Sequence, residues 1–343
     1  MIPRDAIVDL RSDTLTLPTP GLRKAMAQAQ VGDDVFGEDP TVNKLQERVC
    51  ALLGMDASLF VPSGTMANLL AVLAQTQPGD SIILHEDAHP FNYESGNLAM
   101  VAGVMPRTAS GDYGILAADN VAKLVVRSDD HHMSNTTLVA IENTTNRGGG
   151  ALYPLDTIKA ISKVAHEHNM RLHMDGARLF NAVVESGVPA SEYAKCCDTA
   201  SFCFSKGLGA PAGSILAGNA ATIDRAHRYR KMLGGGMRQA GVLAAGALYA
   251  MDHQIERLRQ DHRRAKEFRE ALEDVKGFSF PLPSPTNIVY VDVPGAASFA
   301  QRLARRKVKV LDTGPDRIRC VFHLGIDDRG LDHAVEAFRK CAK

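Results

Sequence analysis

Two short apolar segments, each ending on one ionisable residue and a glycine, say most about the fold and function of this chain. They are Arg171-Leu172-His173-Met174-Asp175-Gly176 and Ser201-Phe202-Cys203-Phe204-Ser205-Lys206-Gly207. Both have the apolar character of strands in an open α/β sheet. In such sheets ligands bind at the carboxyl ends of the strands. The sequence therefore predicts that Asp175 and Lys206 meet at one ligand-binding edge.

An aspartate and a lysine at one sheet edge are the two groups that a pyridoxal 5'-phosphate enzyme needs. The lysine amine forms a Schiff base with the cofactor. The carboxylate keeps the pyridine nitrogen protonated, so that the ring can accept electrons. The alternative is that both are ordinary charged residues at strand ends, because short motifs of this kind often arise by chance.

Composition narrows the class of protein. The chain has 343 residues, of which 45% are hydrophobic, enough for one large and one smaller domain. Lys plus Arg and Asp plus Glu both number 39, so no basic excess exists for nucleic acid or a membrane surface. Charged residues interrupt the N-terminus where a signal peptide would be apolar, and no later run has the length of a membrane span. We expect a soluble, cytoplasmic protein that binds neither nucleic acid nor membrane.

The cysteines and histidines do not predict a metal site. The six cysteines include no CxxC pair, so we expect free, reduced thiols. His166 and His168 lie two apart in a helix-like segment, and such positions do not share a helix face.

Strand-like runs alternate with helical stretches, which is typical of a wound, mostly parallel sheet in an α/β protein. The expected strands are residues 57–61, 81–85, 98–104, 137–142, 171–175 and 201–205. We expect a large domain over residues 1–250, which includes an N-terminal segment 1–30. A helix-prone stretch at 251–275 and a proline-rich break near residue 283 then lead into a small α+β domain, with 251–343 as its range.

Two glycine-containing turns are candidates for binding an anion. Gly64 and Thr65 lie between an expected strand and an expected helix, where backbone N–H groups point at a negative charge. A simple helix cap is the alternative reading of that turn. The second turn, Gly234-Gly235-Gly236-Met237-Arg238-Gln239, carries one arginine and suits either a phosphate or a tight contact between subunits.

Together these motifs resemble the L-threonine aldolases of the low-specificity type. The resemblance spans residues 8 to 325, and it is carried by segments 9–14, 31–40, 63–68, 175–179, 205–211 and 234–241. It implies the aspartate-aminotransferase-like architecture, fold type I, with a large α/β domain and a small C-terminal α+β domain. It also implies pyridoxal 5'-phosphate as cofactor and a homotetramer, a dimer of dimers, with active sites at the dimer interface.

The resemblance assigns roles to ten residues. It implies a Schiff base on Lys206 and a bond from the pyridine nitrogen to Asp175. The remaining cofactor contacts would come from Gly64, Thr65, His89, Arg178, Ser205 and Arg238, the last of which could reach a neighbouring subunit's site. The substrate carboxylate would be held by Ser12, Arg178 and Arg319.

His89 aligns with the family histidine that covers the cofactor ring and lies near the substrate hydroxyl. An imidazole can stack on the ring and can also accept a proton near neutral pH. The sequence departs from the family at Thr145, where a second histidine is common, and at Phe36, where a tyrosine is common. His85 is expected to end a strand in a structural role.

The expected activity is the cleavage of a β-hydroxy-α-amino acid, such as L-threonine, L-allo-threonine or phenylserine, into glycine and an aldehyde. His89, or a water that it holds, would remove the proton from the β-hydroxyl. Another reaction at the same cofactor, β-elimination or racemisation, is the first alternative. A non-catalytic module that binds the cofactor is the second.

Overall fold

The computed structural model describes residues 7–342, whose strands form one large and two small sheets. The large sheet has seven strands in the spatial order β2 (Ala57–Val61), β8 (Ser214–Gly218), β7 (Thr199–Cys203), β6 (Arg171–Asp175), β5 (Thr136–Glu142), β3 (Ser81–His85) and β4 (Met105–Ala109). Neighbouring strands from β7 to β4 are parallel, whereas β8 runs antiparallel to both β7 and β2. The predicted mostly parallel α/β sheet is therefore confirmed.

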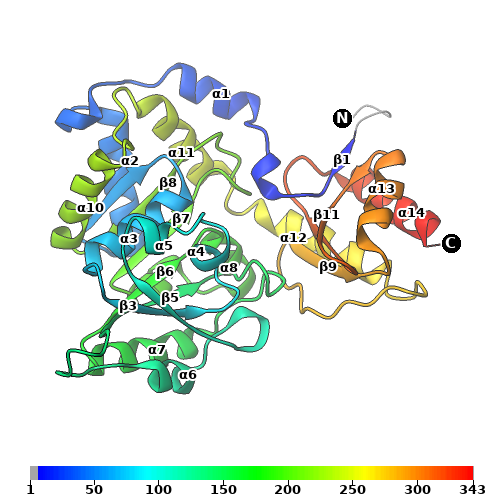
Figure 1. The fold of residues 1–343 in the computed structure, drawn as a ribbon. Coiled ribbons are helices and arrows are strands. Elements are labelled where there is room, and N and C mark those ends of the chain that lie inside the picture. The colour runs from blue at the N-terminus through cyan, green and yellow to red at the C-terminus, as the bar shows by residue number, and fades with distance from the viewer. Residues whose placement is uncertain (1–6, 343) are drawn as a thin grey trace.

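Helices cover both faces of this sheet, because successive residues of each strand point to opposite sides. On one face, Leu59, Val61 and Leu216 pack against helices α3 (Gly64–Gln75) and α10 (Ala220–Met232). The opposite face packs against α2 (Pro40–Leu53), α7 (Leu155–Glu167), α9 (Ala190–Ala194) and α11 (Gly241–His253). The sheet thus lies between two helical layers (Figure 1).

The remaining helices of the sheet-containing part are α1 (Pro20–Ala27), α4 (His89–Asn92), α5 (Asn97–Met100), α6 (Ala118–Leu124) and α8 (Leu179–Ser186). The expected strand at residues 98–104 is wrong, because its first residues form α5 and the strand β4 begins at Met105. Gly96 and Gly103, both with positive φ, bracket this turn of helix. The real strand β4 is an edge strand that contains Pro106 and Arg107, so it lacks the apolar pattern of a buried strand.

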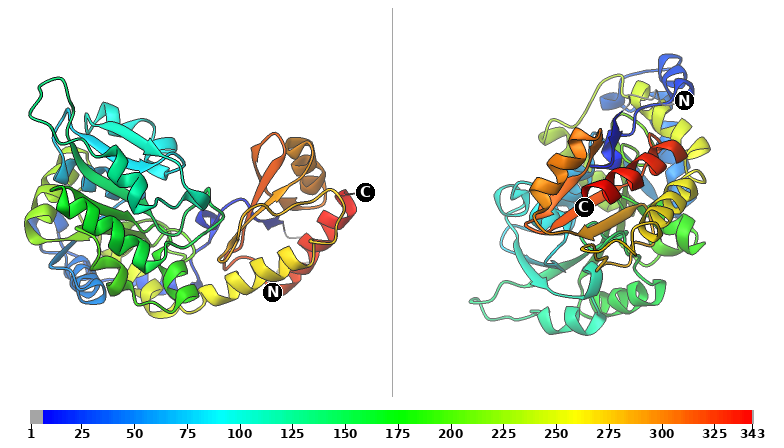
Figure 2. Two further views of the ribbon diagram at one scale, coloured as in Figure 1. Left: turned by 90° about the horizontal axis from the view of Figure 1, so that it is seen from below. Right: turned by 90° about the vertical axis from the view of Figure 1, so that its right-hand side faces the viewer.

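The C-terminal part is a smaller unit with its own core. Strands β11 (Leu311–Gly314), β12 (Arg317–Val321) and β9 (Ile288–Asp292) form an antiparallel sheet that packs with α12 (Leu258–Glu270), α13 (Ala296–Arg305) and α14 (Asp328–Cys341). Edge-to-face contacts among Phe278, Phe299 and Phe338 fill this core. Helix α12 leads from the large unit into this smaller one (Figure 2).

The N-terminal segment contacts both units. Strand β1 (Val8–Asp9) pairs in parallel with β10 (Val308–Lys309) of the C-terminal unit, whereas α1 packs on α11 of the large unit. The division at residue 250 stays a prediction. Among the residues described, no helix has the length and apolar character needed to cross a bilayer.

Candidate active site

The two strand ends singled out in the sequence lie side by side. Asp175 is the last residue of β6, and β7, which pairs with it in parallel, ends at Cys203, three residues before Lys206. The edge where these strands end opens into a cavity of about 320 Å³, a size suited to a small ligand. Its lining includes Ser12, Thr14, His89, Tyr93, Asn146, Arg147, Arg178, Lys206, Tyr290, Leu311, Thr313, Arg317 and Arg319. Both units of the chain therefore contribute to it.

Asp175 is held rigidly beside this cavity. It is buried, its Oδ2 accepts a hydrogen bond of 2.9 Å from Asn68 Nδ2, and its Oδ1 accepts one of 3.0 Å from the backbone N–H of Ala177. Both carboxylate oxygens therefore act as hydrogen-bond acceptors. Asp175 is thus a fixed, buried anion that suits a protonated pyridine nitrogen.

The amino end of α3 approaches the same edge. Ser63 caps the helix by accepting a hydrogen bond from Met66 N–H. Gly64 and Thr65 contribute the first two N–H groups of the helix, which no turn of the helix can satisfy. A Cβ at Gly64 would lie 2.7 Å from Cys203 Sγ, so glycine alone lets the helix end approach β7 this closely. Ser205, in the turn after β7, is half-buried.

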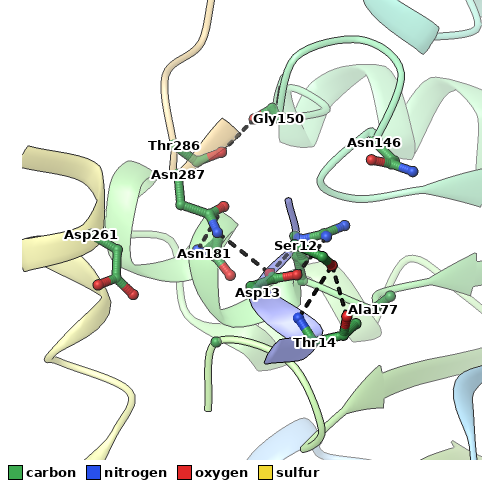
Figure 3. A network of polar contacts seen from close by, with 12 residues as sticks. Ser12, Asp13, Thr14, Asn146, Gly150, Ala177, Asn181, Asp261, Thr286 and Asn287 are labelled. Carbon is green, nitrogen blue, oxygen red and sulfur yellow. Dashed lines mark hydrogen bonds and ion pairs between the residues drawn. The ribbon is translucent and has the colours of Figure 1, made fainter. Parts of the chain in front are cut away.

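Arg178 forms a buried ion pair instead of reaching freely into the cavity. Its Nε and Nη2 donate to the two carboxylate oxygens of Asp13 at 2.7 and 2.8 Å. Burial acts to raise the pKa of Asp13, but the charge and hydrogen bonds of Arg178 hold that pKa far below its usual value. Asn287 also donates to Asp13, at 3.4 Å (Figure 3). The predicted carboxylate-binding role of Arg178 is therefore left to the N–H groups that Asp13 does not use, chiefly those of Nη1.

Arg319 has no such carboxylate partner among the described residues. Its Nη1 donates to Asn146 Oδ1 at 2.8 Å and its Nη2 to the carbonyl of Arg11 at 3.1 Å, both neutral acceptors. Its Nε is buried without a hydrogen-bond partner in the described part of the chain. Two other arginines of the cavity, Arg147 and Arg317, are each paired with an aspartate. Arg319 therefore keeps a positive charge available for an anionic ligand.

Ser12 lines the cavity with a hydroxyl that is already oriented. Its Oγ accepts hydrogen bonds from Thr14 N–H at 3.2 Å and from Thr14 Oγ1 at 2.8 Å (Figure 3). Because both of these bonds use Ser12 as acceptor, its own O–H can be donated to a ligand oxygen.

His89 begins α4 and lines the cavity with a half-buried ring. Its backbone N–H donates to Glu142 Oε2 at 3.0 Å, and its Nδ1 lies 2.9 Å from Glu94 Oε1. Burial acts to lower the pKa of His89, but the hydrogen bond to Glu94 and the charges of Asp175 and Glu142 raise it overall above its usual value. Among the described cavity-lining residues, His89 is the only histidine.

Three positions noted in the sequence lie outside the cavity of this chain. Arg238 is half exposed and pairs with Asp33 at 3.0 Å, so its contact with a cofactor stays a prediction. Phe36 is exposed. Thr145 is buried and donates from Oγ1 to the carbonyl of Tyr113 at 2.8 Å, and it is not among the residues that line the cavity.

His85 ends β3 and is buried, with Nε2 3.0 Å from the carbonyl of Gly111 and Nδ1 accepting from Asp87 N–H. The structural role expected for it matches these contacts. The six cysteines are free thiols, as expected.

Sequence reasoning missed several residues of the site. Asn68 and Glu94 contact Asp175 and His89, and Asn146 and Tyr290 line the cavity. Glu94 could have been suspected, since it follows His89 by five residues in the same short motif. Tyr290 had no local signal, because it lies in an ordinary apolar strand.

The residues present fit pyridoxal phosphate. The buried anion of Asp175, the free N–H groups at the amino end of α3 and the amine of Lys206 suit its pyridine nitrogen, phosphate and aldehyde in turn. Glycine at position 64 lets this helix end lie against β7, because a Cβ there would meet Cys203 Sγ at 2.7 Å.

Comparisons with known proteins identify the family of the chain. Residues 9–295 match the model of the family described as beta-eliminating lyase. The chain is 40% identical to the "Probable low-specificity L-threonine aldolase 2" of Arabidopsis thaliana, over 97% of this chain and 96% of that one. It is also 40% identical to the "Low specificity L-threonine aldolase" of Escherichia coli strain K12, over 97% and 98%.

A solved structure of Leishmania major threonine aldolase has the same fold, with a TM-score of 0.86 at 22% identity, and the match covers 98% of this chain and 99% of that one. The fold expected from the sequence, fold type I, is thereby confirmed. The chain belongs to the beta-eliminating lyase family and, within it, to the low-specificity L-threonine aldolases, which are pyridoxal phosphate-dependent carbon–carbon lyases.

Proposed function

We propose that the protein cleaves L-threonine, L-allo-threonine or a related β-hydroxy-α-amino acid, such as phenylserine, into glycine and an aldehyde. The observation that carries this proposal is the cavity in which Lys206, His89 and Arg319 come together beside the buried anion Asp175. The relatives named as low-specificity L-threonine aldolases support the same activity.

Pyridoxal phosphate, when bound, supplies the electron-accepting ring that makes cleavage next to the α-carbon possible. Lys206 would hold its aldehyde carbon and Asp175 its pyridine nitrogen. Gly64, Thr65 and Ser205 would hold its phosphate at the amino end of α3.

The α-carboxylate of the substrate would be bound by the charge of Arg319 and the hydroxyl of Ser12, with Nη1 of Arg178 as a third donor. Fixing this carboxylate selects the α-bond that breaks, because binding determines the orientation of the substrate. His89 would accept the proton of the β-hydroxyl, since its ring lies at the cavity wall.

Other reactions at the same cofactor remain the closest alternatives. β-Elimination would release a keto acid and racemisation an inverted amino acid, whereas cleavage releases glycine and an aldehyde. A module that binds the cofactor without catalysis is less well supported, because the groups for substrate binding and proton transfer line the cavity together with Lys206.

We further propose a cytoplasmic homotetramer, a dimer of dimers with active sites at the dimer interface, as the family resemblance implies. The exposed side chains of Phe36 and Arg238 are available for such an interface. Arg238 would then reach the cofactor of a neighbouring subunit.

A panel of L-threonine, L-allo-threonine, L-serine and L-phenylserine tests the activity, with glycine and the second product identified by mass. Release of glycine and an aldehyde is expected, and Lys206→Ala should abolish it together with the borohydride-trapped cofactor adduct. Formation of a keto acid or a D-amino acid without glycine would instead support one of the alternative reactions.

A further inference from the structure

Glu94, in the loop between α4 and α5, is a buried glutamate that lies behind the ring of His89. Its side chain is fully buried, and each of its carboxylate oxygens accepts a hydrogen bond. Oε1 accepts from Asn68 Nδ2 at 2.8 Å and lies 2.9 Å from His89 Nδ1, and Oε2 accepts from Asn97 Nδ2 at 3.2 Å. Amide N–H groups only donate, so both oxygens of Glu94 act as acceptors, as those of a carboxylate do.

An ionised Glu94 determines which ring nitrogen of His89 carries the proton. The contact at 2.9 Å is a hydrogen bond only if Nδ1 is protonated, because a carboxylate can only accept. In neutral His89 the lone pair is then on Nε2, the other edge of a ring that lines the cavity.

The amide of Asn68 connects this pair to Asp175. Its two N–H bonds go to Glu94 Oε1 and Asp175 Oδ2, and its oxygen accepts from Ser201 Oγ at 3.3 Å. The same oxygen lies 3.2 Å from Nε2 of His173, a ring kept neutral because burial lowers its pKa to about 4. All four hydrogen-bonding positions of the amide are therefore used, which fixes its orientation.

Glu94, Asn68 and His89 are thus one connected unit with Asp175. One ring nitrogen of His89 and one carboxylate oxygen each of Glu94 and Asp175 all lie within 4.8 Å of one another. We propose that Glu94 is a positioning residue, which holds His89 in the tautomer that has its basic nitrogen toward the substrate, and that Asn68 ties this pair to the carboxylate at the cofactor ring. This inference rests on the proposed function, because it assigns a partner to the base of that reaction.

Several charged groups lie near His89, and together they determine the direction in which its pKa changes when Glu94 is replaced. Glu94 on the adjoining loop, Asp175 of β6 and Glu142 of β5 favour the protonated ring, whereas burial disfavours it. Lys206 lines the same cavity. Removing the charge of Glu94 should therefore lower the pKa of His89, and the other two carboxylates should limit the change.

Two substitutions separate the charge of Glu94 from its hydrogen bond. Glu94→Gln keeps an acceptor for Nδ1 of His89 and removes the charge. The new N–H group replaces the oxygen that accepts from Asn97 Nδ2, and turning over the Asn97 amide lets its Oδ1, a buried atom without a partner in the described part of the chain, accept that N–H. Glu94→Leu removes both the charge and the acceptor. The matched control is Glu86→Gln, because Glu86 is an exposed glutamate that lies just before α4.

The first measurement does not depend on turnover. Carbethoxylation of His89 by diethyl pyrocarbonate is followed by peptide mass spectrometry across pH, in the full-length protein loaded with pyridoxal phosphate. Only the neutral ring reacts, so the rate profile reports the pKa of His89. Glu94→Gln should shift the profile to lower pH by about one unit, so that His89 reacts up to about tenfold faster at acidic pH. Glu86→Gln should leave it unchanged.

The second measurement is the pH profile of kcat/KM for aldol cleavage. Glu94→Gln should move the acidic limb to lower pH and keep most of the activity above it. Glu94→Leu should lose about 10²-fold or more at every pH, which is typical of a misplaced general base. Rescue by glutamine is the signature of a held tautomer, since both substitutions remove the charge.

The two measurements also distinguish this inference from the proposed function. An unchanged carbethoxylation profile in Glu94→Gln would overturn the inference, and so would equal loss of activity in Glu94→Gln and Glu94→Leu. If the wild-type protein releases no glycine from any β-hydroxy amino acid, the proposed function fails, while the carbethoxylation profile still tests the contact between Glu94 and His89. If Glu94→Leu does not fold, the profile of Glu94→Gln alone decides.

Discussion

The arginines of the cavity differ in whether a carboxylate of the protein already neutralises their charge. Sequence reasoning treats Arg178 and Arg319 alike, because both occur in motifs of the family. Their hydrogen bonds distinguish them. Arg178 donates two N–H bonds to the carboxylate of Asp13, whereas Arg319 donates only to neutral oxygens. A distinction of this kind depends on contacts between residues far apart in the chain, and no local pattern contains it.

Arg319→Lys should therefore raise KM for L-threonine by about tenfold or more, because a lysine cannot reproduce a planar fork on a carboxylate. The visible absorbance of the bound cofactor should stay unchanged. Arg147→Lys is the matched control, since Arg147 lines the same cavity but is paired with Asp87. Steady-state kinetics of the two variants provide the comparison. Equal KM values for Arg319→Lys and the wild type would exclude Arg319 as the main carboxylate ligand.

His89→Asn should reduce aldol cleavage much more than it reduces substrate binding, by about 10²-fold or more in kcat. The reason is that His89 is the only described histidine at the cavity wall, and Thr145 directs its hydroxyl to the carbonyl of Tyr113. With one imidazole at the hydroxyl, we also expect weak discrimination between L-threonine and L-allo-threonine. Substrate-induced spectral change measures binding, and glycine release measures cleavage. Full cleavage activity in His89→Asn would assign the base to another group or to water.

At the scale of elements, the sequence predicts those strands whose residues carry the whole signal themselves. The bounds of β6, Arg171–Asp175, match the prediction, because a short apolar run between a helix and a glycine is typical of a buried strand. The sequence does not reveal β4, because an edge strand can be polar, or β8, because only its three central residues are apolar and they follow a glycine-rich turn. The site depends mainly on the well-predicted central strands, which explains why Asp175 and Lys206 were found.

The amino end of α3 gives a prediction at this scale. In Gly64→Ala the new Cβ would meet Cys203 Sγ at 2.7 Å and push the helix away from β7. The affinity for pyridoxal phosphate should fall about tenfold or more, because the N–H groups of α3 lose their alignment with the phosphate. Cofactor titration by absorbance measures the change.

The double variant Gly64→Ala with Cys203→Ala is the matched control for this clash. Removing Sγ makes room for the new methyl group, so most of the affinity should return. Wild-type affinity in Gly64→Ala alone would mean that the phosphate lies elsewhere. Low affinity in both variants would point to the backbone of Gly64 rather than to the contact with Cys203.

At the scale of the whole molecule, Asp13 joins parts of the chain that no sequence pattern connects. Its carboxylate binds Arg178, 165 residues away, and Asn287, 274 residues away, so one buried group contacts the N-terminal segment, the large unit and the C-terminal unit (Figure 3). The sequence predicts a large and a small domain, and five of its expected strands overlap strands of the large sheet. It could not predict what holds them around the cavity, because that contact is made by polar residues without periodicity.

Asp13→Asn should lower the free energy of unfolding by about 3–5 kcal/mol at neutral pH, because it leaves the buried guanidinium of Arg178 without a counter-charge. Urea unfolding followed by circular dichroism measures this loss, and Asp13→Asn combined with Arg178→Met should recover part of it by removing the unpaired charge as well.

The loss of stability in Asp13→Asn should also depend on pH with a definite sign. The folded pKa of Asp13 lies below its usual value of 3.8, so the ionised carboxylate contributes its full stability above that pH and loses it as the pH falls toward the lower folded value. The difference between wild type and Asp13→Asn should therefore be constant near neutrality and shrink in acid, and equal stabilities at pH 7 would show that the pair does not hold the two units together.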